Sequence, residues 1–128
     1  MAYNVLVVDD SLSMRSVIKK TIRATGIAVK EFYEAANGIE ALDILKNHWL
    51  DIILLDYNMP EMDGRALVEY VRQQSWQASV PILMVTSESD MGRLAAVEQA
   101  GVSGICDKPF EPAMLRGLLK GALQQRAA

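Results

Sequence analysis

Three acidic side chains directly follow two short apolar runs. Asp9 and Asp10 follow the run at residues 5–8, and Asp56 follows the run at residues 52–55. Each run is unalternating and rich in branched side chains, which is typical of a strand buried on both faces of a parallel sheet. Carboxylates at one end of such a sheet repel each other and resist ionising unless a cation compensates them. This chemistry favours Mg²⁺, which commonly takes one or two carboxylates and keeps waters that phosphate oxygens can replace.

Two further polar side chains belong to the same predicted edge. Thr86 follows the apolar run at residues 82–85, and Lys108 follows a weaker apolar segment at residues 104–107. In open α/β sheets, ligands bind beyond the carboxyl ends of the strands. The ammonium of Lys108 can neutralise phosphoryl oxygens as a point charge, and the Thr86 hydroxyl can donate a hydrogen bond to one of them. These residues therefore indicate a site for a divalent cation and a phosphoryl group.

The apolar runs alternate with helical patterns five times along the chain. A second weak strand is expected at residues 30–35, and helices are expected between the strands and after the last one. Their predicted boundary residues are Gly26, Asn37 with Glu40, Asp63, Gly101 and Pro112. Because crossovers between parallel strands are right-handed, this order predicts a parallel sheet with helices on both faces.

Two details of the helices are also predicted. Met14, Val17, Ile18 and Ile22 recur at helical spacing and are expected on the buried face of the first helix. The alanine-rich end at residues 124–128 is expected to fray.

Composition favours one small globular domain over residues 1–128. Hydrophobic residues make up 51% and charged residues 23%, and the formal net charge of −3 argues weakly against a nucleic-acid partner. The single cysteine, Cys106, cannot form an internal disulfide and is expected in the core. No apolar run approaches the ~20 residues that span a bilayer, and the start lacks a signal-peptide pattern. We therefore expect a cytoplasmic protein without a membrane partner.

Four motifs together resemble the receiver domain of two-component response regulators. They are Val8-Asp9-Asp10-Ser11, Leu55-Asp56-Tyr57-Asn58-Met59-Pro60-Glu61-Met62-Asp63-Gly64, Val85-Thr86-Ser87 and Asp107-Lys108-Pro109-Phe110. Each is weak alone, but all four in this order at strand ends are highly specific. The resemblance covers essentially the whole chain and is greatest to the stand-alone chemotaxis regulators. It implies a flavodoxin-like, doubly wound α/β fold whose five parallel strands lie in the order 2-1-3-4-5.

The resemblance also implies the roles of the acidic side chains. Asp56 would be the phosphoacceptor. Mg²⁺ would be held by Asp10, by Asp56, by the backbone carbonyl of Asn58 and, partly through water, by Asp9.

Further roles follow from the same resemblance. Thr86 and Lys108 would bind the phosphoryl group, and the Lys108–Pro109 bond would be cis. Asn58 and Glu88 would modulate dephosphorylation. Thr86 would also act as a switch together with the position three residues before the lysine, where the family usually has Tyr or Phe. This chain has Ile105 there, and a branched aliphatic side chain offers no ring or hydroxyl to the switch.

By this resemblance the chain is a phosphorylation-switched interaction module rather than a turnover enzyme. Its phosphodonor would be a sensor histidine kinase, its output would be binding to a downstream target protein, and its pathway would include chemotaxis or motility. We expect a monomer at rest. The alternative is a receiver fragment of a longer regulator with an output domain. A phosphatase of the haloacid dehalogenase type is disfavoured, because it needs Asp-x-Asp where Asp9 and Asp10 are adjacent.

Simpler interpretations of single residues remain open at this point. Asp9 and Asp10 could cap the first helix, since acids favour helix N-termini. Thr86 could be an ordinary strand-end residue, and Lys108 could be a solvated surface lysine.

Overall fold

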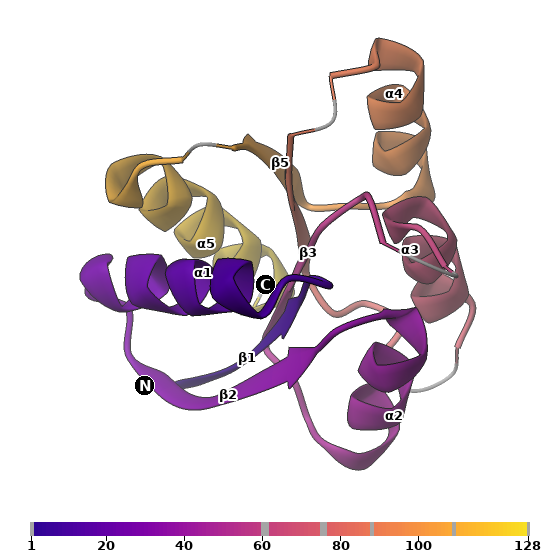
Figure 1. Ribbon diagram of the computed structural model, residues 1–128. Coiled ribbons are helices and arrows are strands. Elements are labelled where there is room, and N and C mark those ends of the chain that lie inside the picture. The colour runs from indigo at the N-terminus through magenta and orange to yellow at the C-terminus, as the bar shows by residue number, and fades with distance from the viewer. Residues whose placement is uncertain (1, 60–61, 75–76, 88, 109, 128) are drawn as a thin grey trace.

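The computed structural model describes residues 2–59, 62–74, 77–87, 89–108 and 110–127. Strands and helices alternate in the order β1 (Tyr3–Val8), α1 (Leu12–Ala24), β2 (Val29–Ala35), α2 (Gly38–Asn47), β3 (Ile52–Leu55), α3 (Gly64–Gln73), β4 (Ile82–Thr86), α4 (Met91–Ala100), β5 (Gly104–Asp107) and α5 (Pro112–Ala127). All neighbouring strands pair in parallel, in the order β2-β1-β3-β4-β5 (Figure 1). The predicted fold and strand order are confirmed.

Two helical layers cover the sheet. Helices α1 and α5 pack on one face, and α2, α3 and α4 pack on the other (Figure 1). Successive residues of the central strands alternate between the two cores, so Val5 and Val7 face α1 and α5 while Leu6 and Val8 face the other layer. Every residue of β3 and β4 is buried. This double burial explains why these strands could be recognised as unalternating apolar runs.

Side-chain caps define the starts of the helices. The Asn37 side chain accepts a hydrogen bond from the Glu40 N–H at 2.9 Å, and the Glu40 carboxylate accepts one from the Ala36 N–H at 2.8 Å. Asp63 caps α3 by accepting from the Ala66 N–H at 2.9 Å. The predicted caps are thus confirmed at both helices. The Asp63 cap matters for the site because α3 begins shortly after Asp56.

One expectation about the helices is wrong. Val17 is 48% exposed, because the buried stripe of α1 is narrow and runs through Ile18 and Ile22. Helix α5 continues to Ala127, and the expected fraying at residues 124–128 stays a prediction.

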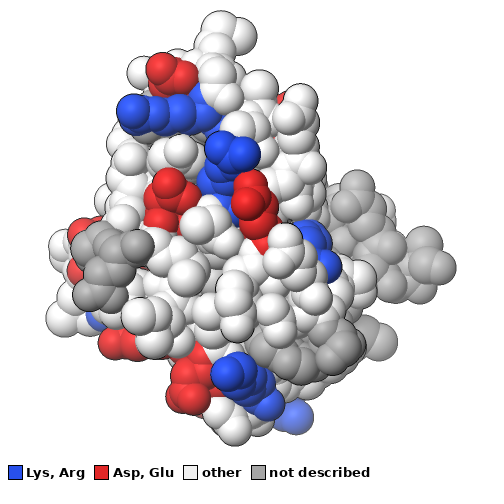
Figure 2. All heavy atoms as spheres, turned by 90° about the vertical axis from the view of Figure 1, so that its right-hand side faces the viewer, with Lys and Arg blue, Asp and Glu red and all other residues white. Residues whose placement is uncertain are grey.

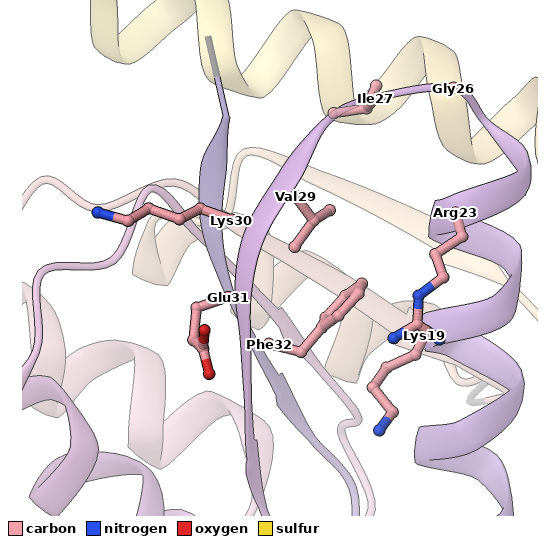
Figure 3. A pocket seen from close by; sticks show the side chains of 8 residues that line it. All are labelled: Lys19, Arg23, Gly26, Ile27, Val29, Lys30, Glu31 and Phe32. Carbon is pink, nitrogen blue, oxygen red and sulfur yellow. The ribbon is translucent and has the colours of Figure 1, made fainter.

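The edge strand β2 is tied to α1 by charged side chains. The Arg23 guanidinium carbon lies 4.9 Å from the centre of the Phe32 ring, and the Lys19 ammonium lies 2.9 Å from the Glu34 carboxylate. Figure 3 shows Lys19 and Arg23 extending from α1 beside Phe32 on β2. The hydrogen bond from Lys19 is the main reason that the pKa of Glu34 lies below its ordinary value. These contacts fix α1, and with it the β1–α1 loop, against the sheet.

A half-buried guanidinium holds α3 and α4 together. Arg72, near the end of α3, donates to the carbonyl of Gly101 at 3.1 Å from Nε and at 2.7 Å from Nη2. Its Nη1 donates to the carbonyls of Ala78 at 2.9 Å and Val80 at 2.6 Å. Gly101 caps α4 with a φ of 110°, in the left-handed region that favours glycine. Arg72 therefore sets where α4 sits beside the site.

No helix in the described part of the chain is long and apolar enough to cross a membrane.

We expect Arg72→Ala to lower the free energy of unfolding by about 2–3 kcal/mol, because it leaves several partly buried carbonyls without their charged donor. Urea unfolding followed by circular dichroism measures this change. Arg65→Ala is the matched control, since Arg65 is exposed and pairs across the helix surface with Glu69, and the loss of such an exposed pair should cost about 0.5 kcal/mol or less. Equal effects of the two substitutions would show that the Arg72 hydrogen bonds do not hold α3 and α4 together.

Candidate functional site

The register of the central strands brings the acidic residues together. Val8 of β1 pairs with Leu55 of β3, so Asp9 and Asp56 leave the sheet side by side. The Asp56 N–H donates to the Val8 carbonyl at 3.0 Å, which continues the ladder into the site. Carboxylate oxygens of Asp9, Asp10 and Asp56 all lie within 4.8 Å of one another. The acids lie at the carboxyl edge of the strands, where the strand order reverses between β1 and β3.

The acidic residues differ in their exposure to solvent. Asp9 is 2% exposed and Asp56 is 9% exposed, whereas Asp10 lies on the surface. Burial raises the pKa of the Asp56 carboxyl above its ordinary value. The Lys108 ammonium lowers it, the negative charge of Asp9 raises it, and hydrogen bonds with Thr86 and the Asn58 N–H lower it. Burial prevails, so an ionised Asp56 is disfavoured in the fold until a further cation is present.

Lys108 lies inside the site. Its ammonium is 3.2 Å from Asp9 Oδ2 and 3.6 Å from Asp56 Oδ2, and its side chain is only 15% exposed. The Lys108 N–H donates to the Thr86 carbonyl at 3.0 Å, so the strand pairing of β4 and β5 positions both residues. Thr86 itself is fully buried. The interpretation of Lys108 as a solvated surface lysine is therefore wrong.

Asp9 is held by contacts that the sequence did not reveal. Its Oδ1 accepts the Ser11 N–H at 2.9 Å, and its backbone carbonyl accepts from Arg15 Nη1 at 2.6 Å. Arg15 Nε is 3.0 Å from the Glu34 carboxylate, so Arg15 links β2 to the β1–α1 loop. The N-cap of α1 is Ser11, whose hydroxyl accepts from the Met14 N–H at 3.2 Å. The alternative interpretation of the acids as helix caps is therefore wrong for this helix.

The charges of the site fit a divalent cation. Three carboxylates, those of Asp9, Asp10 and Asp56, face one ammonium, that of Lys108, which leaves two negative charges without a partner among these four groups. All the acidic ligand atoms are hard oxygens, which suit Mg²⁺. Both oxygens of Asp9 are already engaged, by Ser11 and Lys108. Asp10 and Asp56 are therefore better suited to direct coordination than Asp9.

Of the remaining predicted site residues, some are described by the structure and others are not. Asn58 is exposed beside Asp56, with its N–H 3.5 Å from Asp56 Oδ1. Ile105 is half-buried in β5 opposite Met84 and packs against the core under α2, α3 and α4. Glu88 and Pro109 lie outside the described residues, so the predicted modulator and the predicted cis bond stay predictions.

Gly64 has a positioning role that was not expected from the sequence. A Cβ at this residue would lie 2.8 Å from the Tyr57 Cα and 3.0 Å from the Asp56 carbonyl oxygen. The Gly64 N–H donates to the Tyr57 carbonyl at 2.8 Å. The start of α3 is thus pressed against the backbone that carries Asp56. The only signal in the sequence was a glycine directly after the N-cap Asp63.

Most of the chain matches a known protein family. The family model described as the response regulator receiver domain matches residues 5–120. The chain belongs to this family. Receiver domains take phosphate from histidine kinases, act on downstream targets and bind Mg²⁺ in an acidic site, and they are in general not turnover enzymes.

Chemotaxis proteins are among the relatives of this chain. A chemotaxis protein CheY homolog of Campylobacter jejuni is 40% identical over 119 residues, which cover 92% of this chain and 90% of the relative. The chemotaxis protein CheY1 of Helicobacter pylori is 39% identical over 119 residues, covering 92% and 94%. This receiver therefore has CheY-type relatives along nearly its full length.

Solved structures share the fold. The chemotaxis protein CheY4 of Vibrio cholerae superposes with a TM-score of 0.83 at 36% identity, covering 95% of this chain and 99% of that one. The receiver domain of a sensor histidine kinase from Pseudomonas aeruginosa superposes with a TM-score of 0.83 at 27% identity, covering 97% and 99%. In that neighbour a magnesium ion is coordinated in the active-site cleft.

We expect Asp56→Asn to make the metal-free protein more stable at neutral pH, because it removes a buried carboxylate whose pKa is raised. A raised folded-state pKa destabilises the fold above it, so the gain should shrink as the pH falls toward the ordinary aspartate value of about 4. Urea unfolding in EDTA across this pH range measures the difference. Mg²⁺ should stabilise the wild type more than the variant.

Asp63→Asn is the matched control for this substitution. Asp63 is exposed, and asparagine caps a helix as well as aspartate does. Its stability should change by a few tenths of a kcal/mol at most. A destabilised Asp56→Asn protein at neutral pH would show that the carboxylate is not under electrostatic strain.

Gly64→Ala should lower the free energy of unfolding by about 1–3 kcal/mol and weaken Mg²⁺ binding, because the added methyl group displaces the backbone of Asp56 and Tyr57. Gly117→Ala in α5 has open space around it and should instead stabilise the helix by up to about 1 kcal/mol. Urea unfolding and Mg²⁺ titration of both variants provide the measurements. Unchanged Mg²⁺ affinity in Gly64→Ala would mean that Asp56 does not depend on this contact.

Proposed function

We propose that this receiver accepts a phosphoryl group on Asp56 from the phosphohistidine of a sensor histidine kinase. The observation that supports the proposal is the buried Asp56 carboxylate, which lies 3.6 Å from the Lys108 ammonium and within reach of the carboxylates of Asp9 and Asp10. A nucleophilic carboxylate, a cation for phosphoryl oxygens and an acidic metal site are thus combined at one edge of the sheet.

In the proposed reaction, an oxygen of Asp56 attacks the phosphorus in line with the leaving imidazole. Lys108 moves its charge from the carboxylates toward the incoming phosphoryl oxygens, and the Thr86 hydroxyl donates to one of them. The protein contributes mainly position and charge, as is general in phosphoryl transfer. Such a reaction needs no proton transfer to Asp56, in agreement with the absence of a histidine from the motifs that form the site.

Mg²⁺ would neutralise the charge that builds up on the phosphoryl oxygens. We assign Asp10, Asp56 and the backbone carbonyl of Asn58 as its direct ligands and Asp9 as a ligand through water. The charge balance of the site and the engaged oxygens of Asp9 support this assignment.

Hydrolysis of the aspartyl phosphate would restore the carboxylate. Asn58 is exposed and its N–H lies 3.5 Å from Asp56 Oδ1, and we infer that its side chain modulates this rate. We assign the same role to Glu88, from the family resemblance alone.

The output would be a change of protein binding. Phosphorylation adds charge at the edge of the sheet and draws Thr86 toward it. Ile105 packs as a branched aliphatic side chain, so the signal would pass through Thr86 and the β4–α4 loop without a rotating ring. The CheY-type relatives support a role in chemotaxis or motility.

We further propose that residues 1–128 act as a single receiver domain, cytoplasmic and monomeric at rest. The matched residues cover 90% and 94% of the two CheY-type relatives, which supports one receiver domain over this region. Figure 2 shows that Lys and Arg alternate with Asp and Glu over the face formed by α2, α3 and α4. This interspersed pattern, with the net charge of −3, suits a protein target better than nucleic acid.

Incubation with acetyl phosphate and Mg²⁺ should add one phosphoryl group to the wild type, because Asp56 combines nucleophile and metal site. Intact-mass spectrometry measures the adduct. Asp56→Asn and an EDTA sample should show none, and Asp43→Asn, at an exposed aspartate of α2 away from the site, should be labelled like the wild type.

Rapid hydrolysis is separated from lack of function by beryllium fluoride, a stable mimic of the phosphoryl group. If the wild type neither gains the adduct nor binds beryllium fluoride in the presence of Mg²⁺, the proposed phosphoacceptor role is wrong.

A further inference from the structure

A hollow opens beside Asn58, on the outer side of the acidic site. Its volume is about 610 Å³. The described residues that line it come from the loops after β1 and β3 and from the first turn of α4, and they are Asp10, Tyr57, Asn58, Met59, Asp63 and Arg93. Because Asp10 and Asn58 belong both to this hollow and to the predicted metal site, the hollow is continuous with the place where a phosphodonor must bind.

Among the described residues that line the hollow, acidic side chains outnumber basic ones. Asp10 and Asp63 contribute two carboxylates, and Arg93 is the one basic side chain among its described lining residues. Mg²⁺ bound by Asp10 would offset one carboxylate, whereas the Asp63 side chain accepts a hydrogen bond from the Ala66 N–H as the cap of α3. An anionic group that enters this space is therefore repelled by Asp63 and attracted by Arg93.

The backbone places Arg93 firmly at this position. The Arg93 backbone N–H donates to the Asp90 side chain at 2.9 Å, and Asp90 thereby caps the first turn of α4. The far end of α4 is held by Arg72 through Gly101. The Arg93 side chain itself is exposed, so its substitution leaves both anchors of the helix intact.

Small phosphodonors differ in the charge of the group that leaves. When Asp56 attacks acetyl phosphate, a bond forms between its oxygen and phosphorus, the bond from phosphorus to the acetyl oxygen breaks, and the electron pair leaves with acetate as a full negative charge. When Asp56 attacks N-protonated phosphoramidate, the phosphorus–nitrogen bond breaks and neutral ammonia leaves. Only the first reaction develops negative charge on the leaving group, where a nearby cation lowers the barrier.

We propose that Arg93 binds the leaving carboxylate of acyl phosphate donors and thereby selects them over donors with a neutral leaving group. The inference rests on the proposed phosphorylation of Asp56 and adds a specificity-determining residue to it. A planar guanidinium matches a carboxylate with paired hydrogen bonds, which an ammonium cannot do. Arg93 contacts the donor. Phosphohistidine that is protonated on its other ring nitrogen releases neutral imidazole, so it gains nothing from Arg93.

The test compares initial rates of phosphorylation by acetyl phosphate and by phosphoramidate, with Mg²⁺ and at one ionic strength. Arg93→Gln should lower the rate with acetyl phosphate about tenfold, the size expected for one charge-assisted hydrogen bond. Its rate with phosphoramidate should change less than about twofold, since that leaving group carries no charge. Arg93→Lys should restore part of the acetyl phosphate rate, because it keeps the charge but loses the paired geometry.

Arg65→Gln is the matched control. Arg65 is an exposed cation on α3 that pairs with Glu69 and does not line the hollow, so its ratio of the two rates should equal that of the wild type. The inference is overturned if Arg93→Gln slows both donors equally or slows neither while the wild type is phosphorylated. A wild type that neither donor labels and that binds no beryllium fluoride would instead overturn the phosphoacceptor role together with this inference.

Discussion

The site depends on the repulsion between two buried carboxylates, those of Asp9 and Asp56, and on the single ammonium of Lys108 that lies between them. Both carboxylates are largely buried, and one ammonium, that of Lys108, cannot neutralise two negative charges. Its position, closer to Asp9 than to Asp56, leaves Asp56 the less compensated of the two. This uncompensated negative charge attracts a divalent cation. A phosphoryl group that binds together with this cation is then a better occupant of the site than solvent.

The rest of the fold keeps these unfavourable charges together. The parallel register of β1 and β3 aligns the residues that precede Asp9 and Asp56, and Arg15 fastens the first loop to the edge strand through Glu34. On the other side, the lack of a side chain at Gly64 lets α3 begin against the backbone of Asp56. Burial of branched side chains on both faces of the sheet supplies the free energy that offsets the electrostatic cost. Stability and reactivity are therefore opposed at this edge, as is common at functional sites.

Prediction from sequence succeeded where short-range pattern and composition decide. The central strands are buried on both faces and show as unalternating apolar runs, and the caps Asn37 and Asp63 act within three residues. It failed at Val17, because helical periodicity does not tell how wide the buried stripe of α1 is.

The sequence by itself determined the order of the elements, the strand ends at which the acids, Thr86 and Lys108 stand, and the family. These depend on hydrophobic periodicity and on residues adjacent along the chain. Only the tertiary structure decided that Lys108 pairs more closely with Asp9 than with Asp56, that Arg15 and Arg72 join distant segments, and that Arg93 shares a hollow with Asp10. Each of these contacts joins segments from different elements, and their distances follow from packing in three dimensions, which the spacing of residues along the chain does not encode.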